Sequence, residues 1–291
     1  MTIRHDPRRD FERTRQMNRE TRSAERLSAH YVLEQGLAER LRAAAREERA
    51  NVYSEVYAEL FASLPDHPQH TAARTGQSGR VASQVALLEP LLGSERRYLE
   101  IGCGDAAVTF AMAGRATIAY GLDVTAALVP QAAPQNFRLL LSDGVNIPLP
   151  SASVDLAYSN QLMEHLHPDD AGAQLREIVR VLAPGGKYLC RTPSRLSGPH
   201  DISVYFDYEA TGFHLCEYDY RSLRRLLRDA GFAHVRFFVN GRRRVLVPYP
   251  LAASLELVLG ALPRAARVSA GRRLAPLLGV SAIASKGHAP S

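Results

Sequence analysis

The stretch Tyr98-Leu-Glu-Ile-Gly-Cys-Gly-Asp-Ala-Ala107 decides the fold of this chain. Its apolar first half predicts a buried β-strand, and its glycines predict a tight turn that opens a helix. Gly102 and Gly104 let a ligand approach the backbone closely, which a Cβ atom would obstruct. The carboxylates of Glu100 and Asp105 flank the turn. They suit a ligand with cationic groups better than a pyrophosphate, which favours bare amides and a helix N-terminus.

The glycine spacing alone leaves more than one ligand class open. Gly102-x-Gly104-x-x-Ala107 satisfies the loose dinucleotide fingerprint, so a dehydrogenase is one alternative. The next apolar run, from Ala119 to Asp123, ends in a carboxylate about 20 residues beyond the turn. Such a side chain closes a second strand and can accept hydrogen bonds from both hydroxyls of a ribose. The pattern therefore predicts a ligand that contains a ribose.

Three more apolar runs follow along the chain. Residues 137–144 predict a short strand whose polar end suits an adenine edge. Residues 153–160 predict a fourth strand, which is followed by Gln161 and then by His165. Residues 181–190 contain the turn Leu-Ala-Pro-Gly-Gly and lead into a fifth strand. Strands that alternate with helices in this way predict a parallel α/β sheet.

The chain resembles class I S-adenosylmethionine-dependent methyltransferases in five motifs, which are EIGCGD, YGLD, LLLSDG, SNQLMEHL and LAPGGKY, in this order within residues 80–192. Within that group it is similar to the branch called methyltransferase type 11. A nicotinamide enzyme has no reason to carry the Leu-x-Pro-Gly-Gly turn at that place. The resemblance implies an α/β fold with a Rossmann-like, seven-stranded, mostly parallel sheet and helices on both faces.

The resemblance also implies the cofactor, which is S-adenosylmethionine, and the product formed from it, S-adenosylhomocysteine. The cofactor is expected at the ends of the first four strands, where the motifs place polar residues and glycines. The residues assigned to cofactor binding are Glu100, Gly102, Gly104, Asp105, Asp123, Val124, Ser142, Asp143, Gly144, Asn160 and Gln161.

The length of 291 residues suits one large α/β domain with an appendage. We expect an N-terminal helical arm over residues 1–75 and the methyltransferase domain over residues 76–291. Within the domain, residues 193–218 are expected to form a lid. Residues 241–279 are expected to form a helical insertion before the last strand, which departs from the minimal fold.

The arm has an apolar face that needs a partner surface. We interpret its aromatic residues Tyr53, Tyr57 and Phe61 as core packing, and the face can lie over the cofactor cleft or across a homodimer interface. The loop that follows contains His67 and His70, which we interpret as polar surface.

The composition limits the cellular compartments and the binding partners that we expect for this protein. The three cysteines show neither metal-binding spacing nor a disulfide framework. No apolar run reaches the ~20 residues of a membrane span, and the start lacks a secretory signal, so we expect a cytoplasmic protein. The net charge is +6, and residues 221–291 carry 13 basic residues against 2 acidic ones. This basic tail can meet a phosphate-bearing substrate, an anionic membrane surface or nucleic acid, or be a solvated surface.

Residues 191–218 show neither a helical nor an alternating period. Ordered loops much longer than ~15 residues are usually lids or binding loops, and this one follows a strand at whose carboxyl end ligands bind. The loop contains His200 and His214. Together with His165 they are candidate bases, because the pKa of histidine lies near neutrality and a base accelerates methylation of a hydroxyl. We favour His200, because Gly198-Pro199 fixes the chain just before it.

Several acceptors can be argued against. Enzymes that methylate amino groups of DNA bases or glutamine carry an Asn/Asp-Pro-Pro-Tyr/Phe turn after strand four, where this chain has Ser-Asn-Gln-Leu at 159–162. RNA cytosine C5 methylation would need a cysteine near that place. A metal-dependent catechol enzyme would need a set of acidic ligands, which Asp155 and Asp169 do not make, so we expect no metal.

We therefore expect methyl transfer to a small molecule or a glycan, at a hydroxyl oxygen, and no nucleic-acid partner. One alternative is a methyltransferase that acts on protein or RNA. Another is a non-catalytic, cofactor-binding partner subunit.

Overall fold

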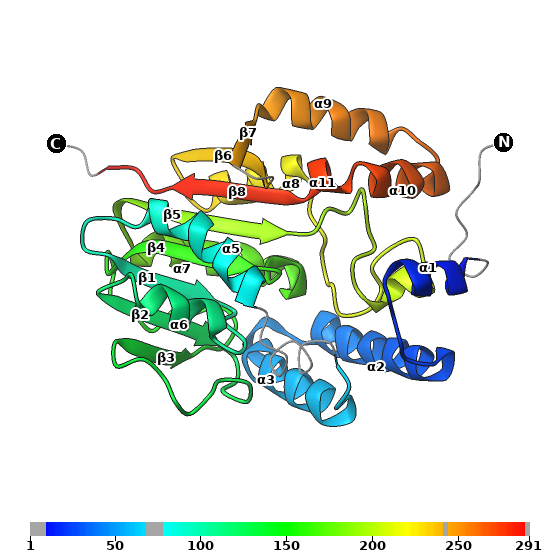
Figure 1. The fold of residues 1–291 in the computed structure, drawn as a ribbon, viewed down its shortest axis with the longest axis horizontal. Helices are drawn as coiled ribbons and strands as arrows, with labels where there is room; N and C mark the ends of the chain where they lie inside the picture. Colours follow the sequence, from blue (N-terminus) through cyan, green and yellow to red (C-terminus); the bar gives the residue numbers. More distant parts are fainter. Residues whose placement is uncertain (1–9, 68–77, 241–243, 289–291) are drawn as a thin grey trace.

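A computed structural model describes residues 10–67, 78–240 and 244–288. Its centre is an eight-stranded sheet with the strand order β3-β2-β1-β4-β5-β8-β6-β7 (Figure 1). Strands β1 to β5 pair in parallel, whereas β8 runs antiparallel to β5 and β6, and β6 pairs antiparallel with β7. The strands are β1 Arg97–Ile101, β2 Ile118–Asp123, β3 Phe137–Leu141, β4 Val154–Asn160, β5 Leu182–Thr192, β6 His234–Asn240, β7 Arg244–Val247 and β8 Val280–Ser285.

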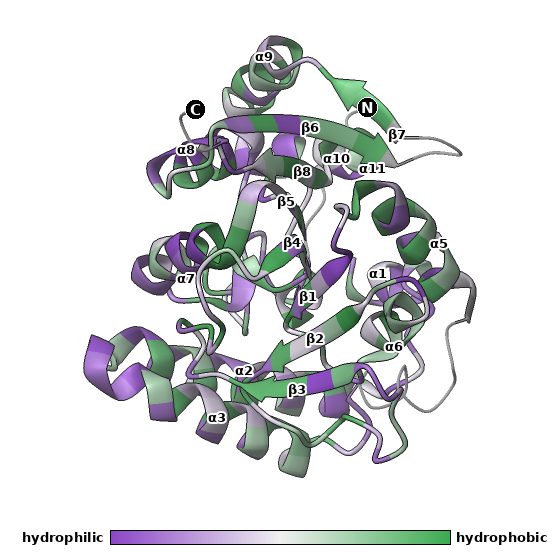
Figure 2. Cartoon of the chain, turned by 90° about the vertical axis from the view of Figure 1, so that its left-hand side faces the viewer, coloured by the Kyte–Doolittle hydropathy of each residue, from purple (hydrophilic) through white to green (hydrophobic). Residues whose placement is uncertain are grey.

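Helices cover both faces of this sheet. α5 and α6 lie on one face and α7 and α8 on the other (Figure 2). The helices are α1 Phe11–Met17, α2 Ala24–Ala43, α3 Arg46–Ser63, α5 Ser78–Leu88, α6 Ala107–Ala113, α7 Pro168–Val181, α8 Tyr220–Asp229, α9 Tyr249–Gly260, α10 Arg264–Arg273 and α11 Ala275–Leu278. Short 3-10 turns are η1 Glu89–Leu91, η2 Met163–His165 and η3 Ile202–Tyr205.

The strands alternate their side chains between the two layers of the core. Tyr98 and Leu156 pack under α5 and α6, whereas their neighbours Leu99 and Ala157 pack toward α7 and α8. Successive side chains of a strand point to opposite faces, so a strand that is covered on both sides is apolar throughout. This explains why the motif strands read as continuous apolar runs. The α/β architecture predicted from the sequence is confirmed.

Two helix ends follow the local signals in the sequence. α3 ends at Ser63, two residues before Pro65, which cannot continue a helix. α8 begins after Asp219, whose carboxylate accepts a 2.7 Å hydrogen bond from the backbone N–H of Ser222. This is an N-cap, and it satisfies a backbone donor that the first turn of a helix leaves free.

The sheet has eight strands, where the sequence predicted seven. The additional strand, β7, pairs with the end of β6 as the outermost strand of the sheet. It lies inside residues 241–279, which we expected to be helical, and it is only four residues long. So short a run between an arginine cluster and a proline carries little periodicity. The rest of that insertion within the described residues is helical, as α9, α10 and α11.

The insertion also exposes large apolar side chains. Figure 2 shows β7 and much of α9 as hydrophobic, and Leu251 and Val258 are 67% and 64% exposed. Val245, Leu246, Leu257 and Leu277 add to the same region. Among the described residues, none of the helices combines the length and the apolar character that crossing a bilayer requires.

The loop after β5 docks on the N-terminal arm. Ile202 and Tyr205 are buried with Leu27 of α2. The ring of Phe206 stacks on Tyr31 of α2 with centroids 4.6 Å apart. Several aromatic residues of the expected lid therefore anchor it to the protein.

Candidate functional site

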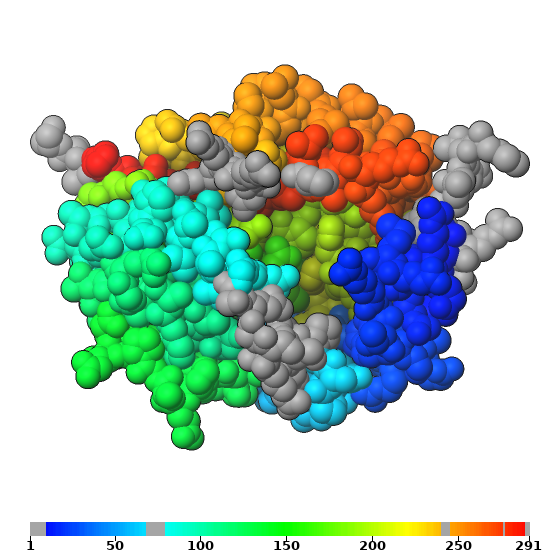
Figure 3. All heavy atoms as spheres, viewed as in Figure 1, coloured from blue at the N-terminus to red at the C-terminus, as the bar shows by residue number. Residues whose placement is uncertain are grey.

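A cavity of about 1030 Å³ opens at the carboxyl ends of β1, β2 and β4. This is where the strand order reverses direction, the usual binding place in an open α/β sheet. The surface is hollowed between the N-terminal arm, α5 and the insertion (Figure 3). Ten of the predicted cofactor residues line the cavity: Glu100, Gly102, Gly104, Asp105, Asp123, Val124, Ser142, Gly144, Asn160 and Gln161.

Both glycines of the turn are needed for its shape. Gly102 and Gly104 have φ of +71° and +54°, in the left-handed region that favours glycine. A Cβ atom on Gly102 would lie 2.9 Å from Leu162 Cδ1, whereas one on Gly104 would meet no atom within 4 Å. Gly104 therefore leaves its side of the cavity open to a ligand.

Asp123 is held by the backbone around it. Its carboxylate accepts hydrogen bonds from the N–H groups of Gly104 at 2.9 Å, Val124 at 2.8 Å and Thr125 at 3.3 Å. Burial nevertheless raises the pKa of this carboxyl. Each carboxylate oxygen can accept more than one hydrogen bond, so capacity for ribose hydroxyls remains.

Glu100 lies at the floor of the cavity. Thr109 Oγ1 donates a 2.5 Å hydrogen bond to its Oε2. Burial raises the pKa of Glu100 to about 8, and the nearby carboxylates of Asp105 and Asp123 add to the shift. A cationic group of a ligand would favour the ionised form again.

The end of β3 is organised by local hydrogen bonds. Gly144 N–H donates to Ser142 Oγ at 3.1 Å, and the carboxylate of Asp143 accepts from the N–H groups of Val145 and Asn146 at 2.9 and 2.7 Å. Asp143 caps this turn and does not itself line the cavity. Its assignment to cofactor binding stays a prediction.

The N-terminal arm contributes a wall that sequence reasoning did not assign to the site. Tyr57 and Phe61 of α3 pack against the core, as expected, and also line the cavity. Tyr53 is buried as expected and lines the cavity too, with its hydroxyl donating to Asp170 at 3.1 Å. The signal in the sequence was the apolar face of the arm, for which a place over the cofactor cleft was one alternative.

A second cavity of about 460 Å³ adjoins the first. Tyr57 and His165 line both cavities, so they form the boundary between them. The second cavity contains all three of the histidines predicted as candidate bases, His165, His200 and His214.

The three histidines have different surroundings. His165 Nδ1 lies 3.0 Å from the carbonyl oxygen of Phe213, and burial lowers the pKa of its ring to about 3, so the ring is neutral. Burial also opposes the charge of His214, but a 2.8 Å hydrogen bond to Glu217 and the carboxylate of Glu164 raise its pKa to about 9.

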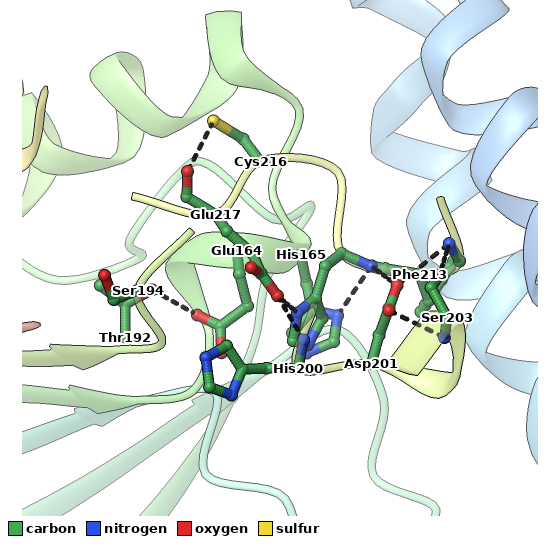
Figure 4. Close-up of polar contacts among 12 residues, drawn as sticks. Glu164, His165, Thr192, Ser194, His200, Asp201, Ser203, Phe213, Cys216 and Glu217 are labelled. Atoms are coloured by element: carbon green, nitrogen blue, oxygen red, sulfur yellow. Dashed lines mark hydrogen bonds and ion pairs between the residues drawn. The ribbon is translucent and has the colours of Figure 1, made fainter. Parts of the chain in front are cut away.

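His200 is the third. Its Nε2 lies 3.0 Å from Ser197 Oγ, and burial lowers the pKa of its ring. Figure 4 shows His200 beside Glu164 and Glu217, on the stretch of loop that leads to Asp201. The structure thus brings the three predicted bases to one cavity next to the glycine turn.

Sequence and structure comparisons agree with this geometry. Residues 99–190 match a family described as a methyltransferase domain. A probable S-adenosylmethionine-dependent methyltransferase of Mycolicibacterium smegmatis is 35% identical over 139 residues, which are 47% of this chain and 52% of that protein. EEF1A lysine methyltransferase 4 of Mus musculus is 27% identical over 206 residues, which are 64% of this chain and 76% of that protein.

A solved structure shows a similar fold. It is the Burkholderia thailandensis 1,6-didemethyltoxoflavin-N1-methyltransferase with bound 1,6-didemethyltoxoflavin and S-adenosylhomocysteine. It superposes with a TM-score of 0.50 at 18% identity and covers 84% of this chain and 91% of its own. The chain spans about half the length of the mycobacterial relatives that it matches.

Proposed function

We propose that the chain transfers the methyl group of S-adenosylmethionine to a hydroxyl oxygen of a small molecule or a glycan. The match of residues 99–190 to a methyltransferase domain and the S-adenosylmethionine-dependent relatives support the cofactor and the reaction. The observation that carries this proposal is the pair of joined cavities. One is lined by the glycine turn with the carboxylates of Glu100, Asp105 and Asp123, and the other by five histidines, which include the three candidate bases.

The first cavity suits the cofactor chemically. Glu100, Asp105 and Asp123 surround the turn with negative charge, which attracts the ammonium and sulfonium groups of S-adenosylmethionine. In this proposal Asp123 accepts the ribose hydroxyls, and Ser142 and Gly144 contact the adenine. The reactive methyl group would then face Tyr57 and His165, at the boundary with the second cavity.

The transfer itself needs positioning more than covalent chemistry. A lone pair of the acceptor oxygen attacks the methyl carbon, and the electron pair of the broken C–S bond stays on sulfur, which leaves neutral S-adenosylhomocysteine. Alignment of the oxygen with the C–S bond supplies much of the acceleration. The hydroxyl proton passes to a base, and His200 is our candidate because it lines the second cavity and belongs to the loop above it.

The size of the second cavity favours a small acceptor. Ile202, Tyr205 and Phe213 are buried where they line it, so the loop encloses the acceptor side. A folded protein or an RNA would have to insert a single side chain or base. The basic insertion and the lysine methyltransferase among the relatives support that second candidate function.

Incorporation of label from methyl-labelled S-adenosylmethionine tests the proposal. The full chain is incubated with separated small-molecule, glycan, protein and RNA fractions of a cell extract. We expect label in the small-molecule or glycan fraction. Label that appears only in protein or RNA would support the second candidate. Tight binding of the cofactor without label in any fraction would indicate a non-catalytic, cofactor-binding subunit.

A further inference from the structure

Three potential metal ligands converge at the boundary of the two cavities. Glu164 and His165 belong to η2, directly after β4, and His214 belongs to the loop after β5. One ligand atom of each lies within 4.8 Å of the others. Small side-chain rotations would bring them to the ~2.0–2.2 Å at which nitrogen and oxygen ligands bind a transition metal.

Each imidazole is oriented through Nδ1, so Nε2 is the atom with which it would contact an ion. The carbonyl of Phe213 holds His165 at Nδ1, and the carboxylate of Glu217 holds His214 at Nδ1. Metal-binding histidines characteristically donate their second ring N–H to a carbonyl or a carboxylate, which fixes the tautomer and the ring.

Glu164 supplies an independent sign that a ligand belongs here. Its side chain is fully buried, and Thr192 Oγ1 donates a 2.9 Å hydrogen bond to Oε2 (Figure 4). Among the described residues, Oε1 has no hydrogen-bond partner. A buried carboxylate oxygen without a partner is costly, and a bound ion is one of its ordinary explanations.

A nearby cluster of similar composition shows the contrast. His30, Glu34 and His67 also bring their ligand atoms within 4.8 Å of one another. Here, however, Arg22 donates to His30 Nδ1 at 2.8 Å, and His30 Nε2 lies 2.7 Å from Glu34 Oε1. The other oxygen of Glu34 accepts from the N–H of Phe213 at 3.0 Å. The protein satisfies this cluster itself, and the adjacent guanidinium would repel a cation.

We propose that Glu164, His165 and His214 bind one divalent transition-metal ion, and that this ion holds an oxygen atom of the methyl acceptor. The second part rests on the proposed function. Two imidazoles and a carboxylate suit Zn²⁺, Mn²⁺, Fe²⁺ or Co²⁺, and three protein ligands leave positions open for a substrate oxygen. His165 lines both cavities, so the ion would lie between cofactor and acceptor. The sequence analysis expected no metal, because it tested cysteine spacing and the acidic residues Asp155 and Asp169 and did not consider Glu164, His165 and His214 as one set.

Titration of the chelator-treated full chain with Co²⁺ tests the site directly. We expect one ion per chain, with visible absorption bands that report nitrogen and oxygen ligands. His214→Ala should weaken binding at least tenfold. Glu217→Gln, which keeps an oxygen for the N–H of His200 but removes the charge that faces His214 Nδ1, should weaken it by roughly 10–100-fold. It serves as the second variant if His214→Ala fails to fold by circular dichroism.

His30→Gln is the matched control, because it alters the neighbouring cluster and should leave Co²⁺ affinity within about twofold. Loss of binding in His30→Gln but not in the His214 or Glu217 variant would overturn the assignment, as would no binding by the wild type. Calorimetry with S-adenosylmethionine is run in parallel. Cofactor binding without metal binding refutes this inference alone, whereas failure of cofactor binding refutes the proposed function.

Discussion

The backbone N–H of Gly104 donates a 2.9 Å hydrogen bond to the carboxylate of Asp123, and this bond ties the glycine turn to the end of β2. Val124 and Thr125 donate to the same carboxylate. Asp123 is therefore fixed before any ligand arrives, so little conformational entropy is lost when it accepts a ribose. The same carboxylate has a structural role and an expected binding role.

Asp123→Ala should weaken binding of S-adenosylmethionine at least tenfold. The variant removes two expected charge-assisted hydrogen bonds, each worth about 1.5–3 kcal/mol. It also leaves three backbone N–H groups without an acceptor, so the thermal midpoint should fall.

Asp155→Ala is the matched control. Asp155 is buried and accepts the N–H of Arg97 at 2.9 Å, but it lies at the opposite end of the sheet. Calorimetry should show cofactor affinity within twofold for this control; equal losses in both variants would mean that Asp123 acts only on stability.

Glu100 should make the unliganded protein less stable as the pH rises. Its pKa is about 8 in the fold against 4.5 ordinarily, mainly because of burial, with Asp105 and Asp123 adding to the shift. Between these values the folded chain keeps a proton that the unfolded chain has lost. The free energy of unfolding therefore falls with pH across this window, by up to about 1.4 kcal/mol per unit, and levels off above pH 8. Urea titrations at pH 5 to 9 measure this. In Glu100→Gln the free energy of unfolding should not decline in this way. If it falls with pH in parallel in the variant and the wild type, the prediction is contradicted.

The ion pair between Arg49 and Asp170 should hold the N-terminal arm on the domain. Arg49 Nε and Nη2 donate to the two oxygens of Asp170 at 2.7 and 2.8 Å, and both side chains are buried. Arg49→Ala leaves a buried carboxylate uncompensated, which typically costs about 3–5 kcal/mol. Arg40→Ala removes only exposed pairs with Glu55 and Glu59 and should cost less than about 1 kcal/mol. Urea denaturation of the two variants measures the loss in the free energy of unfolding. Similar small losses in both variants would show that the buried pair contributes little to stability.

The predicted cofactor residues that the structure brings together are those that local patterns determine. Gly102 and Gly104 mark a backbone conformation that other residues avoid, and the carboxyl ends of parallel strands meet at one edge of a sheet. Residues just after successive strands must therefore lie together. Ten of the eleven predicted cofactor residues do line one cavity.

The remaining parts depend on contacts between distant segments. Nothing in the loop after β5 indicates that His214 lies against Glu164, because that loop has no period from which a direction could be read. Tyr57 presented the same difficulty, since an aromatic residue on an apolar helix face packs in a core or lines a pocket with the same spacing. Only the position of the N-terminal arm on the domain shows whether Tyr57 packs in a core, lines a pocket or does both. β7 was missed because four residues are too few for alternation to be recognised.

The loop over residues 193–218 should become protected from hydrogen exchange when S-adenosylhomocysteine and the acceptor are both bound. Tyr31 anchors this loop, because its ring stacks on Phe206 and its hydroxyl lies 2.7 Å from Thr211 Oγ1. Tyr31→Ala should speed up exchange in the loop by the equivalent of about 1–2 kcal/mol. Tyr31→Phe keeps the stacking and should give a smaller effect. Equal protection with and without ligands would argue for a fixed structural loop.

The final prediction concerns the base. His200 lines the second cavity but not the first, and its Nε2 lies 3.0 Å from Ser197 Oγ. His200→Ala should therefore lower turnover by ~10²-fold or more and leave cofactor affinity within about twofold. His200→Gln separates the two roles of the side chain, because its amide can still contact Ser197 but cannot take the proton of a hydroxyl. If the glutamine variant turns over the true acceptor at a near-normal rate, His200 is not the base. Alignment of acceptor and cofactor would then be the main source of the rate.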